Sequence, residues 1–364
     1  MNTLGTTYRC TLLGESHGNV VGVVIDGAPA GIPFTEADVQ PALDRRRPGQ
    51  SDVTTPRDEK DRVEILSGTH DGVTTGATLL MLIHNQDKDS SKYLDFLTKP
   101  RPGHADLTAR VAYQDHNDHR GGGLFSGRLT AGLVMAGALA TKVLERQGIE
   151  IAAHTHRIGD VQAEQVPDVA TIRTHVEDTP VRCADPGAAE RMEALIHDHR
   201  KQQDSVGGVV QAIAEGLPAG LGDPWFHKVE AVVAHAMMAL PATKGVSFGE
   251  GFQATELPGS DHNDPFTYDE AGRLTTRSNH AGGTLGGITT GRPLRTQVVF
   301  KPASSIGQAQ RTVNIETGEE DTLTVEGRHD PCVVPRAVPV VEATLACALL
   351  DLIQLRRMRG HGRS

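Results

Sequence analysis

The feature that most constrains the fold of this chain is an internal repeat whose spacing drifts along the sequence. Gly27-Ala-Pro-Ala-Gly31 returns as Gly216-Leu-Pro-Ala-Gly220, an offset of 189 residues (27 to 216). Asp71-Gly-Val-Thr-Thr-Gly76 returns as Gly286-Gly-Ile-Thr-Thr-Gly291, an offset of 215 residues (71 to 286). Because the offsets differ by 26 residues (189 against 215), the pattern predicts two diverged copies with an insertion rather than a regular solenoid.

Apolar periodicity indicates how each copy folds. Apolar and β-branched runs predict strands in the first half at 20–25, 62–69 and 76–84. Long apolar helices are predicted over 130–147, where Gly148 follows the end, and over 339–358, which opens with a proline. Since sheets and helices each need another layer to cover their apolar faces, the economical arrangement is two sheets over a shared helical layer, an α+β fold.

The chain is expected to form one unit rather than separate domains. Its 364 residues are enough to bury a large core. We expect the two halves to lie at about 1–150 and 205–364, within a single domain over 1–364. Between them, a less patterned and polar insertion is expected at about 152–206, with a surface helix near 188–201.

A cluster of three arginines ends a short helix predicted near the N-terminus. Thr35 is placed to cap this helix, and Asp38 completes a capping-box pattern. The run Arg45-Arg46-Arg47 precedes a proline and complements the helix dipole. On general grounds such a cluster is a solvated helix end, and a place in a binding site is the alternative.

The stretch 99–128 has the composition of a ligand-binding loop. Two prolines fix the backbone before Gly103, and the run Gly121-Gly122-Gly123 allows close backbone approach ahead of the long helix at 130–147. Free N–H groups where a helix begins bind anions, and arginines within the stretch add positive charge. The pattern favours a phosphorylated ligand, against the alternative of a flexible glycine loop.

Composition argues against several classes of partner and location. A net charge of −10 argues against a nucleic-acid-binding protein, because the phosphate backbone needs a broad basic surface. No stretch approaches the ~20 apolar residues that span a bilayer, and no basic segment precedes an apolar run at the N-terminus, so we expect no membrane partner. The widely spaced cysteines are typical of free thiols in a reducing compartment, and a cytoplasmic location is expected. They are Cys10, Cys183, Cys332 and Cys347.

Seven motifs, in order along the chain, resemble those of the chorismate synthase family. They are Gly14-Glu-Ser-His-Gly18, Asp44-Arg-Arg-Arg-Pro-Gly49, Arg101-Pro-Gly-His-Ala-Asp106, Arg120-Gly-Gly-Gly123, Ser278-Asn-His-Ala-Gly-Gly283, Lys301-Pro-Ala-Ser-Ser305 and Gly327-Arg-His-Asp-Pro-Cys332. Each motif alone is a weak signal, but seven in register are specific. The resemblance runs from about Thr7 to Leu355, nearly the whole chain.

The resemblance implies a fold and a reaction. The implied fold is a β-α-β sandwich of two mostly antiparallel sheets around a helical layer, with an internal pseudo-two-fold repeat. In the implied reaction, 5-enolpyruvylshikimate 3-phosphate loses its phosphate and a ring hydrogen in a 1,4-elimination that gives chorismate, in the shikimate pathway of aromatic amino-acid biosynthesis. The family requires reduced FMN, involves NADPH only where the flavin is reduced in situ, and is typically a homotetramer.

The same resemblance implies roles for individual residues. His17 is the expected acid at the departing phosphate, His104 the expected partner of the flavin's pyrimidine end, and Asp330 the expected carboxylate near flavin N5. The expected substrate contacts are the guanidinium groups of Arg46, Arg128 and Arg336. The expected flavin-binding residues are Ser126, Ala242, Gly286, Lys301, Pro302, Ala303, Ser304, Ser305 and Arg328. No metal ligand is expected.

The chain departs from the common family pattern at three places. Many members follow the triple glycine with Arg-Ser-Ser, whereas this chain has Leu124-Phe125-Ser126 and then Gly127-Arg128. A common asparagine is Pro241 here, and a second family arginine is Asp52. These changes bear on flavin affinity and on NADPH-driven reduction of the flavin.

Two other hypotheses follow from the residues. His104, Asp106, His116 and His119 have a spacing compatible with a metal site, which would suit a metal-dependent hydrolase or lyase. The altered glycine loop leaves room for a non-catalytic binding protein or a paralogue acting on a related shikimate ester. Metal analysis would test the first hypothesis, and an assay with reduced FMN would test the second.

Overall fold

One antiparallel sheet comes from the first half of the chain. The computed structural model describes residues 2–47, 61–86, 93–164, 167–325 and 330–360. The five strands, in the order β1-β2-β3-β7-β4, are Thr3–Leu4, Arg9–Gly14, Val20–Asp26, Leu79–His84 and Val63–Ser67. A hairpin of β5 (Thr69–His70) and β6 (Val73–Thr74) joins β4 to β7. All three strands predicted in this half are confirmed.

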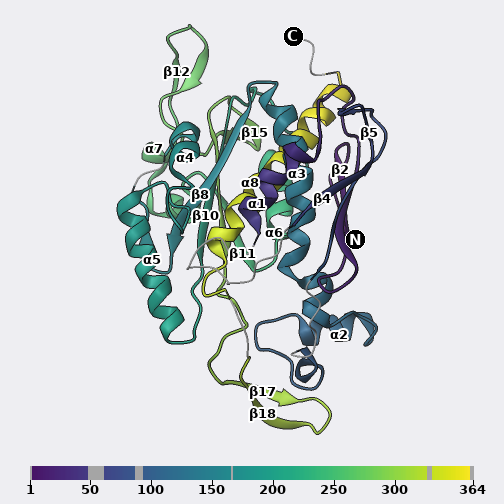
Figure 1. The fold of residues 1–364 in the computed structure, drawn as a ribbon. Helices are drawn as coiled ribbons and strands as arrows, with labels where there is room; N and C mark the ends of the chain where they lie inside the picture. Colours follow the sequence, from purple (N-terminus) through teal and green to yellow (C-terminus); the bar gives the residue numbers. More distant parts are fainter. Residues whose placement is uncertain (1, 48–60, 87–92, 165–166, 326–329, 361–364) are drawn as a thin grey trace.

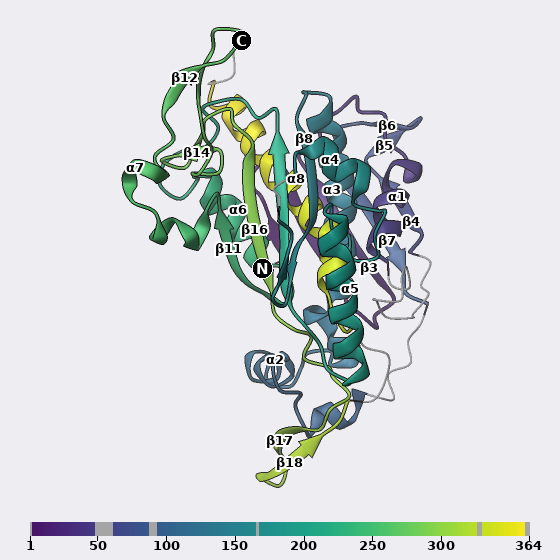
Figure 2. The same ribbon diagram turned by 90° about the vertical axis from the view of Figure 1, so that its left-hand side faces the viewer.

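The second sheet is also antiparallel, with the strand order β11-β16-β10-β8-β9. These strands are Thr243–Phe248, Leu294–Phe300, Gly208–Glu215, Glu150–Ile158 and Val161–Gln162. β8 lies largely in the segment 152–206, so the expectation of a less patterned insertion fails for its first residues. Helices cover β8 on both faces of the sheet (Figure 2), so successive side chains of β8 from Ile151 to His156 are all buried. In a strand with one solvent-exposed face, buried and exposed positions would alternate.

The helices α3 and α8 form the layer between the two sheets, with α1 and α6 beside them (Figures 1 and 2). The bounds of α1, α3, α6 and α8 are Glu36–Arg46, Thr130–Glu145, Val229–Met238 and Val334–Met358. α3 contacts β2 and β3, while α8 contacts β8 and β10. A Cβ on Gly132 would come within 2.7 Å of the Gly22 carbonyl oxygen, and one on Gly137 within 2.3 Å of Ala343 Cβ. The small residues of α3 thus allow both neighbours to approach closely.

The starts and ends of these helices agree with the predictions except at α8. Asp38 Oδ2 accepts a hydrogen bond of 2.8 Å from the Thr35 N–H, as the capping pattern predicts. Gly148, just after α3, has a φ of +74°, the left-handed conformation expected of a helix stop. α8 begins five residues before Pro339 (334 against 339), so the prediction that this proline opens the helix is wrong.

A buried arginine explains how α8 accommodates Pro339. A proline inside a helix donates no hydrogen bond to the carbonyl four residues earlier, which is that of Pro335. Arg182 Nη1 donates to this carbonyl at 2.8 Å instead, and the Arg182 side chain is buried. A distant side chain therefore replaces the missing backbone donor.

The two similar sequence segments make matching hydrogen bonds. Thr74 Oγ1 donates to the Pro29 carbonyl at 2.6 Å and accepts from Ile32 N–H at 3.0 Å. In the second segment, Thr289 Oγ1 donates to the carbonyl of Pro218 at 2.6 Å and accepts from the N–H of Leu221 at 2.8 Å. Each threonine holds the proline turn of its own half against a short hairpin.

The remaining elements lie around these layers. α4 (Val169–His175) and α5 (Pro186–Lys201) pack outside the second sheet, and α5 confirms the helix predicted near 188–201. The shorter helices are η2 Asp95–Leu97, α2 Asp106–Tyr113, η3 Arg120–Phe125, η4 Gly127–Leu129, η5 Gly251–Glu256 and α7 Gly259–His262. The hairpin strands are β12 Phe266–Tyr268 with β13 Leu274–Thr276, β14 Thr284–Leu285 with β15 Ile288–Thr289, and β17 Gln310–Asn314 with β18 Glu319–Leu323.

Two helices are long and apolar enough to cross a membrane, so the expectation that no stretch approaches this length is wrong. They are 127–145 and α8, and 72% and 83% of their most apolar windows are buried inside the structure. Core helices of a globular protein have this composition too, because they are covered on several sides. All four cysteines are free and buried.

Candidate active site

A cavity of about 530 Å³ opens where loops from both halves of the chain meet. Its walls come from the β2–β3 turn, the end of α1, the glycine loop before α3, the loop after β16 and the start of α8. His17, His104 and Asp330 all line it, although they lie far apart in the sequence. The three residues expected to be catalytic are therefore brought together.

The glycine loop lies directly against His17. Gly121, Gly122 and Gly123 have φ values of +61°, +82° and +50°, which side chains rarely tolerate. A Cβ on Gly121 would come within 2.2 Å of the His17 ring, so only glycine allows this approach. The imidazole is buried, and its edge packs against the Tyr93 ring with the ring centroids 5.2 Å apart.

His104 lies next to Gly122 of the same glycine loop and is held by a charged pair. Its Nδ1 lies 2.6 Å from Asp106 Oδ1 and 3.0 Å from Arg101 Nη2. Arg101 Nε also donates to Asp106 Oδ2 at 2.8 Å, and its guanidinium stacks 4.3 Å from the centre of the Phe96 ring. Burial raises the pKa of Asp106, but hydrogen bonds from Arg101 and His104 outweigh it and hold that pKa well below its usual value. Asp106 is thus a carboxylate at neutral pH.

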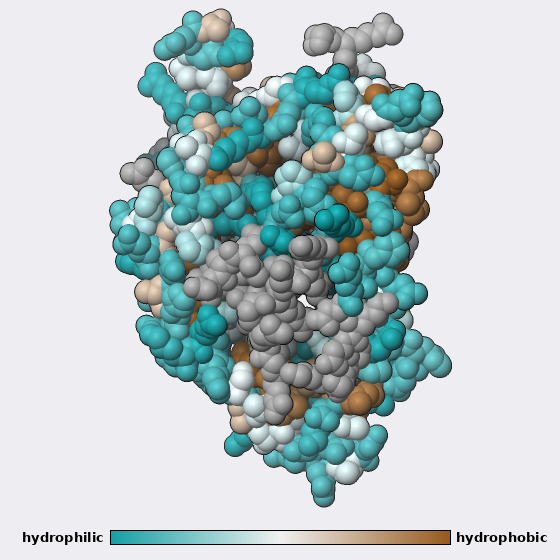
Figure 3. Space-filling view, in the orientation of Figure 1, coloured by the Kyte–Doolittle hydropathy of each residue, from teal (hydrophilic) through white to brown (hydrophobic). Residues whose placement is uncertain are grey.

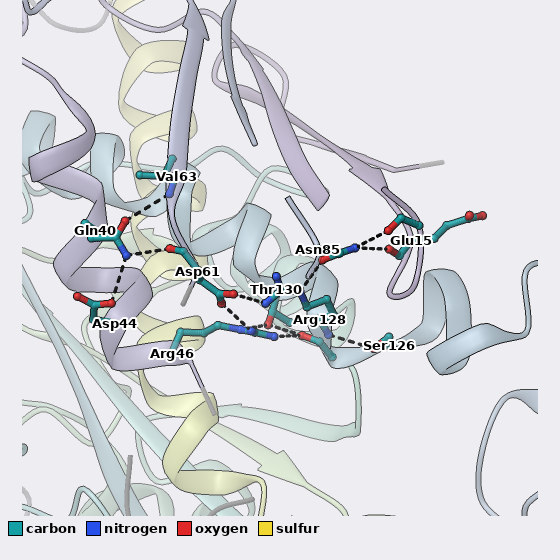
Figure 4. A network of polar contacts seen from close by, with 12 residues as sticks. Glu15, Gln40, Asp44, Arg46, Asp61, Val63, Asn85, Ser126, Arg128 and Thr130 are labelled. Atoms are coloured by element: carbon teal, nitrogen blue, oxygen red, sulfur yellow. Dashed lines mark hydrogen bonds and ion pairs between the residues drawn. The ribbon is translucent and has the colours of Figure 1, made fainter. Parts of the chain in front are cut away.

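Arg46 and Arg128 reach the cavity from α1 and from η4, and both contact the buried carboxylate of Asp61 (Figure 4). Arg46 Nη2 also donates to the Gly127 carbonyl at 2.6 Å. Arg128 Nε donates to Asn85 Oδ1 at 3.1 Å. The two guanidinium groups therefore share one acidic partner beneath the cavity.

The loop after β16 supplies a cation and hydroxyl groups. Lys301, Ala303, Ser304 and Ser305 line the cavity, and burial lowers the pKa of Lys301 with a further contribution from Lys244. Lys301 N–H donates to the Ala242 carbonyl at 3.0 Å, which places Ala242 on the same wall.

The start of α8 supplies an ion pair. Arg336 Nη1 lies 2.5 Å from Asp330 Oδ2, and both side chains are mostly buried. The Arg336 Nε atom is buried without a hydrogen-bond partner. A buried donor that the protein does not satisfy is suited to a polar ligand.

Comparison with known proteins identifies the family. The family model described as chorismate synthase matches residues 8–354. The chorismate synthase of Methanopyrus kandleri is 50% identical over 360 residues, covering 97% of this chain and 92% of that protein. The chorismate synthase of Korarchaeum cryptofilum is 49% identical over 356 residues, 98% of each chain. The chain belongs to the chorismate synthase family.

The fold supports the same assignment. A solved structure titled as a crystal structure of chorismate synthase superposes with a TM-score of 0.76 at 29% identity, covering 96% of this chain and 92% of the other. The α+β class expected from the sequence is therefore correct.

Three of the residues that the chorismate synthase resemblance implicates do not line the cavity or cannot be placed. Gly286 lies in the tight turn between β14 and β15, and Pro302 is within the lining loop without facing the cavity. Arg328 lies outside the described residues, as does Asp52. The other predicted site residues all line the cavity.

Sequence reasoning missed Asn85, which lines the cavity, and Asp61, which does not line it but contacts two lining arginines. It also raised a metal cluster that the structure does not support. Asp61 and Asn85 belong to none of the seven chorismate synthase motifs, and only their spatial contacts with Arg46 and Arg128 reveal them. Within the described ranges, no three His, Cys, Asp or Glu side chains are grouped as a metal ion would need.

Proposed function

We propose that this chain converts 5-enolpyruvylshikimate 3-phosphate into chorismate and inorganic phosphate, with reduced FMN as cofactor. The observation that carries the proposal is the convergence of His17, His104 and Asp330 on one cavity with several cationic side chains. In this 1,4-elimination the carbon–oxygen bond to phosphate and one ring carbon–hydrogen bond break, and a second ring double bond forms. The hydrogen leaves as a proton in the overall balance, so nothing is oxidised.

The charge of the cavity suits this substrate. The described lining residues include five lysine or arginine side chains and one carboxylate, that of Asp330. They are Arg46, Arg101, Arg128, Lys301 and Arg336. We assign Arg46, Arg128 and Arg336 to the substrate, because planar guanidinium groups match carboxylate and phosphate oxygens.

His17 is the group that we assign to the departing phosphate. An imidazole has an unperturbed pKa of about 6.5, so a nearby anion is enough to keep it protonated near neutral pH. The glycine loop packs against its ring and limits where the ring can turn. A fixed, protonated imidazole donates a hydrogen bond to the oxygen that gains charge as the bond to carbon breaks.

A second group of lining residues suits a flavin mononucleotide. Gly103 has a φ of +72°, a conformation that favours glycine, and it lies next to Ser304 of the hydroxyl loop. Lys301, Ser304 and Ser305 would hold the anionic cofactor, with the lining residues Ser126, Ala242 and Ala303 as further family-derived contacts. His104 would face the pyrimidine end, where a cation stabilises an anionic ring. When bound, reduced FMN supplies electron density that assists loss of the phosphate, and Asp330 helps to accept the ring hydrogen.

The loop after the triple glycine bears on flavin affinity and on NADPH-driven reduction of the flavin. Leu124 and Phe125 stand where many relatives have an arginine and a serine, and Phe125 lines the cavity. This loop carries one cation fewer near the flavin. NADPH takes part only if the flavin is reduced in place.

We also propose that the chain is one domain, a β-α-β sandwich with a pseudo-two-fold repeat, that works as a cytoplasmic homotetramer. One continuous cluster of buried apolar residues runs through both halves, and Thr74 and Thr289 make matching bonds in the two copies.

The proposed assembly rests on the outer face of β7, a strand that is apolar at five successive positions. Because successive side chains point to opposite faces of a sheet, Leu80 and Leu82 lie on this outer face, where they are only half-buried. Figure 3 shows apolar surface on the right-hand side, where this sheet lies in Figure 1. Such a face is typical of contact with another copy.

An anaerobic assay tests the function. The purified chain is mixed with 5-enolpyruvylshikimate 3-phosphate and dithionite-reduced FMN, and chorismate and phosphate are measured together. We expect equal amounts of the two products, and none with oxidised FMN. Tight substrate binding without any chorismate would instead indicate a non-catalytic binding protein.

A further inference from the structure

Asp61 is a buried carboxylate that lies between the two arginines assigned to the substrate. Its side chain is 1% exposed. Asp61 Oδ2 lies 3.4 Å from Arg46 Nη1, and Asp61 Oδ1 accepts a hydrogen bond from Arg128 Nη1. Figure 4 shows both guanidinium groups next to this carboxylate, with one contact to each of its oxygens.

The backbone of Asp61 is itself fixed to α1. Gln40 Nε2 donates to the Asp61 carbonyl at 2.8 Å, and Gln40 Oε1 accepts from the Val63 N–H at 3.3 Å. Gln40 therefore ties the segment before β4 to the same helix that carries Arg46. The carboxylate and one of its two partners form one rigid unit.

The other partner is connected to the turn that carries His17. Asn85 accepts from Arg128 Nε, and Asn85 Nδ2 donates to the carbonyls of Glu15 at 3.1 Å and of Gly18 at 3.0 Å. These carbonyls lie on either side of His17 in the sequence. A continuous set of hydrogen bonds thus links Arg46, Asp61, Arg128 and the His17 turn.

Electrostatics explains why a carboxylate is needed at this point. Two guanidinium groups held close together in a poorly hydrated site repel each other, and this repulsion is stronger than in water. The charge of Asp61 offsets it, and the three side chains together keep one net positive charge for an anionic ligand. Since a buried charge is costly unless it is paired, removal of Asp61 would make both arginines seek other partners.

We propose that Asp61 is a positioning residue that orients Arg46 and Arg128 toward the anionic groups of the substrate. The inference rests on the proposed function, because it assigns the two arginines to 5-enolpyruvylshikimate 3-phosphate. Asp61 itself makes no contact with the reacting atoms and acts through its neighbours.

Steady-state kinetics with Asp61→Asn tests the inference. Because misplaced binding groups cost up to about 10² in rate, we expect kcat/KM to fall by about that factor, with at least a tenfold rise in KM. The matched control is Asp71→Asn, which removes the same charge from an exposed turn with a φ of +50° that asparagine also tolerates. A purely structural role would lower the melting temperature and the fraction of active enzyme, but not change KM.

A double-mutant cycle shows whether Asp61 acts through Arg128. We expect Asp61→Asn and Arg128→Lys together to lower kcat/KM by much less than the product of their separate effects. Independent effects, or an unchanged KM in Asp61→Asn, would overturn the inference. If Asp61→Asn does not fold, Gln40→Met is measured instead, because it removes the hydrogen bond to the Asp61 carbonyl without removing charge. A raised KM in Gln40→Met would support the inference, and an unchanged KM would overturn it. A wild-type chain that makes no chorismate would refute the proposed function instead.

Discussion

Cations in the cavity are held by carboxylates before any ligand binds. Arg101 is paired with Asp106, and Arg336 with Asp330, in addition to the pair bridged by Asp61. Each pair fixes a planar group whose orientation decides how it meets an oxygen anion. Little side-chain entropy then remains to be lost when an anion binds.

Among the residues of the cavity, the imidazoles of His17 and His104 should contribute most to turnover. We expect His17→Ala and His104→Ala each to lower kcat by about 10², the usual contribution of a general acid or a fixed cation. The measurement is anaerobic chorismate formation, with circular dichroism to show that both variants are folded. His70→Ala, on an 81% exposed side chain, is the control and should keep the wild-type rate. Wild-type rates in both site variants would rule out the assigned roles.

His154, which lies outside the site, should make the free energy of unfolding fall at acidic pH. Burial lowers the pKa of His154 to about 4, against 6.5 for an exposed histidine. Between these values the unfolded chain binds a proton that the folded chain does not, so stability falls as the pH falls from 6.5 toward 4. The full effect is about 3 kcal/mol.

Urea unfolding at several pH values checks this expectation. In His154→Gln the loss of stability below pH 6.5 should be smaller than in the wild type, because the side chain no longer titrates. His70→Gln serves as the exposed control and should follow the wild-type curve. Parallel curves for His154→Gln and wild type would contradict the assignment.

Among the elements, α8 depends on a donor from another part of the chain. Replacing Arg182 with methionine leaves the Pro335 carbonyl buried without its donor, so we expect the free energy of unfolding to fall by about 2 kcal/mol. The control Arg191→Met removes a half-exposed arginine and should change stability by less than about 0.5 kcal/mol.

The substitution Pro339→Ala provides a sharper test of the same contact. Alanine restores the N–H that the Pro335 carbonyl lacks, so Arg182→Met should cost less in the Pro339→Ala background than in the wild type. Equal costs in the two backgrounds would show that Arg182 stabilises the fold in some other way, such as its ion pair with Glu177.

The elements differ in how well their sequences predict them. α3 and the strands β3 and β7 follow their apolar patterns, because burial alone decides them. The sequence pattern predicts the start of α8 at Pro339, because a proline usually opens a helix and nothing local indicates the arginine that replaces its donor. β8 contains histidine, threonine and arginine, and its burial depends on helices on both sides that only the tertiary structure provides.

For the molecule as a whole, the outer face of β7 leads to a prediction about assembly. We expect light scattering to give a mass of four chains, and Leu82→Glu to yield a smaller species, because a charge on this face opposes burial by a second copy. Leu82→Met, which keeps the apolar surface, is the control and should stay tetrameric. A wild-type chain that runs as a monomer would contradict the proposed assembly.

The candidate site was predictable where motifs mark it and hidden where only packing does. His17, His104 and Asp330 lie in glycine or proline turns whose residue order is specific to one family. Asp61 has no such surroundings, and Asn85, which contacts the same Arg128, is simply the residue after a strand. Their contribution arises when β4, β7 and α1 come together, which no local pattern records.

The chain of contacts from α1 to α8 bears on attempts to shorten this enzyme. Arg45 pairs with Glu177, Glu177 pairs with Arg182, and Arg182 closes the gap left by Pro339. Deleting the segment that carries Glu177 and Arg182 would therefore remove a hydrogen-bond donor to α8. It would also remove a contact of α1, the helix that carries Arg46. A shortened variant has to supply a substitute donor for the Pro335 carbonyl of α8, and among the described residues Arg45 would keep only its ion pair with Glu342.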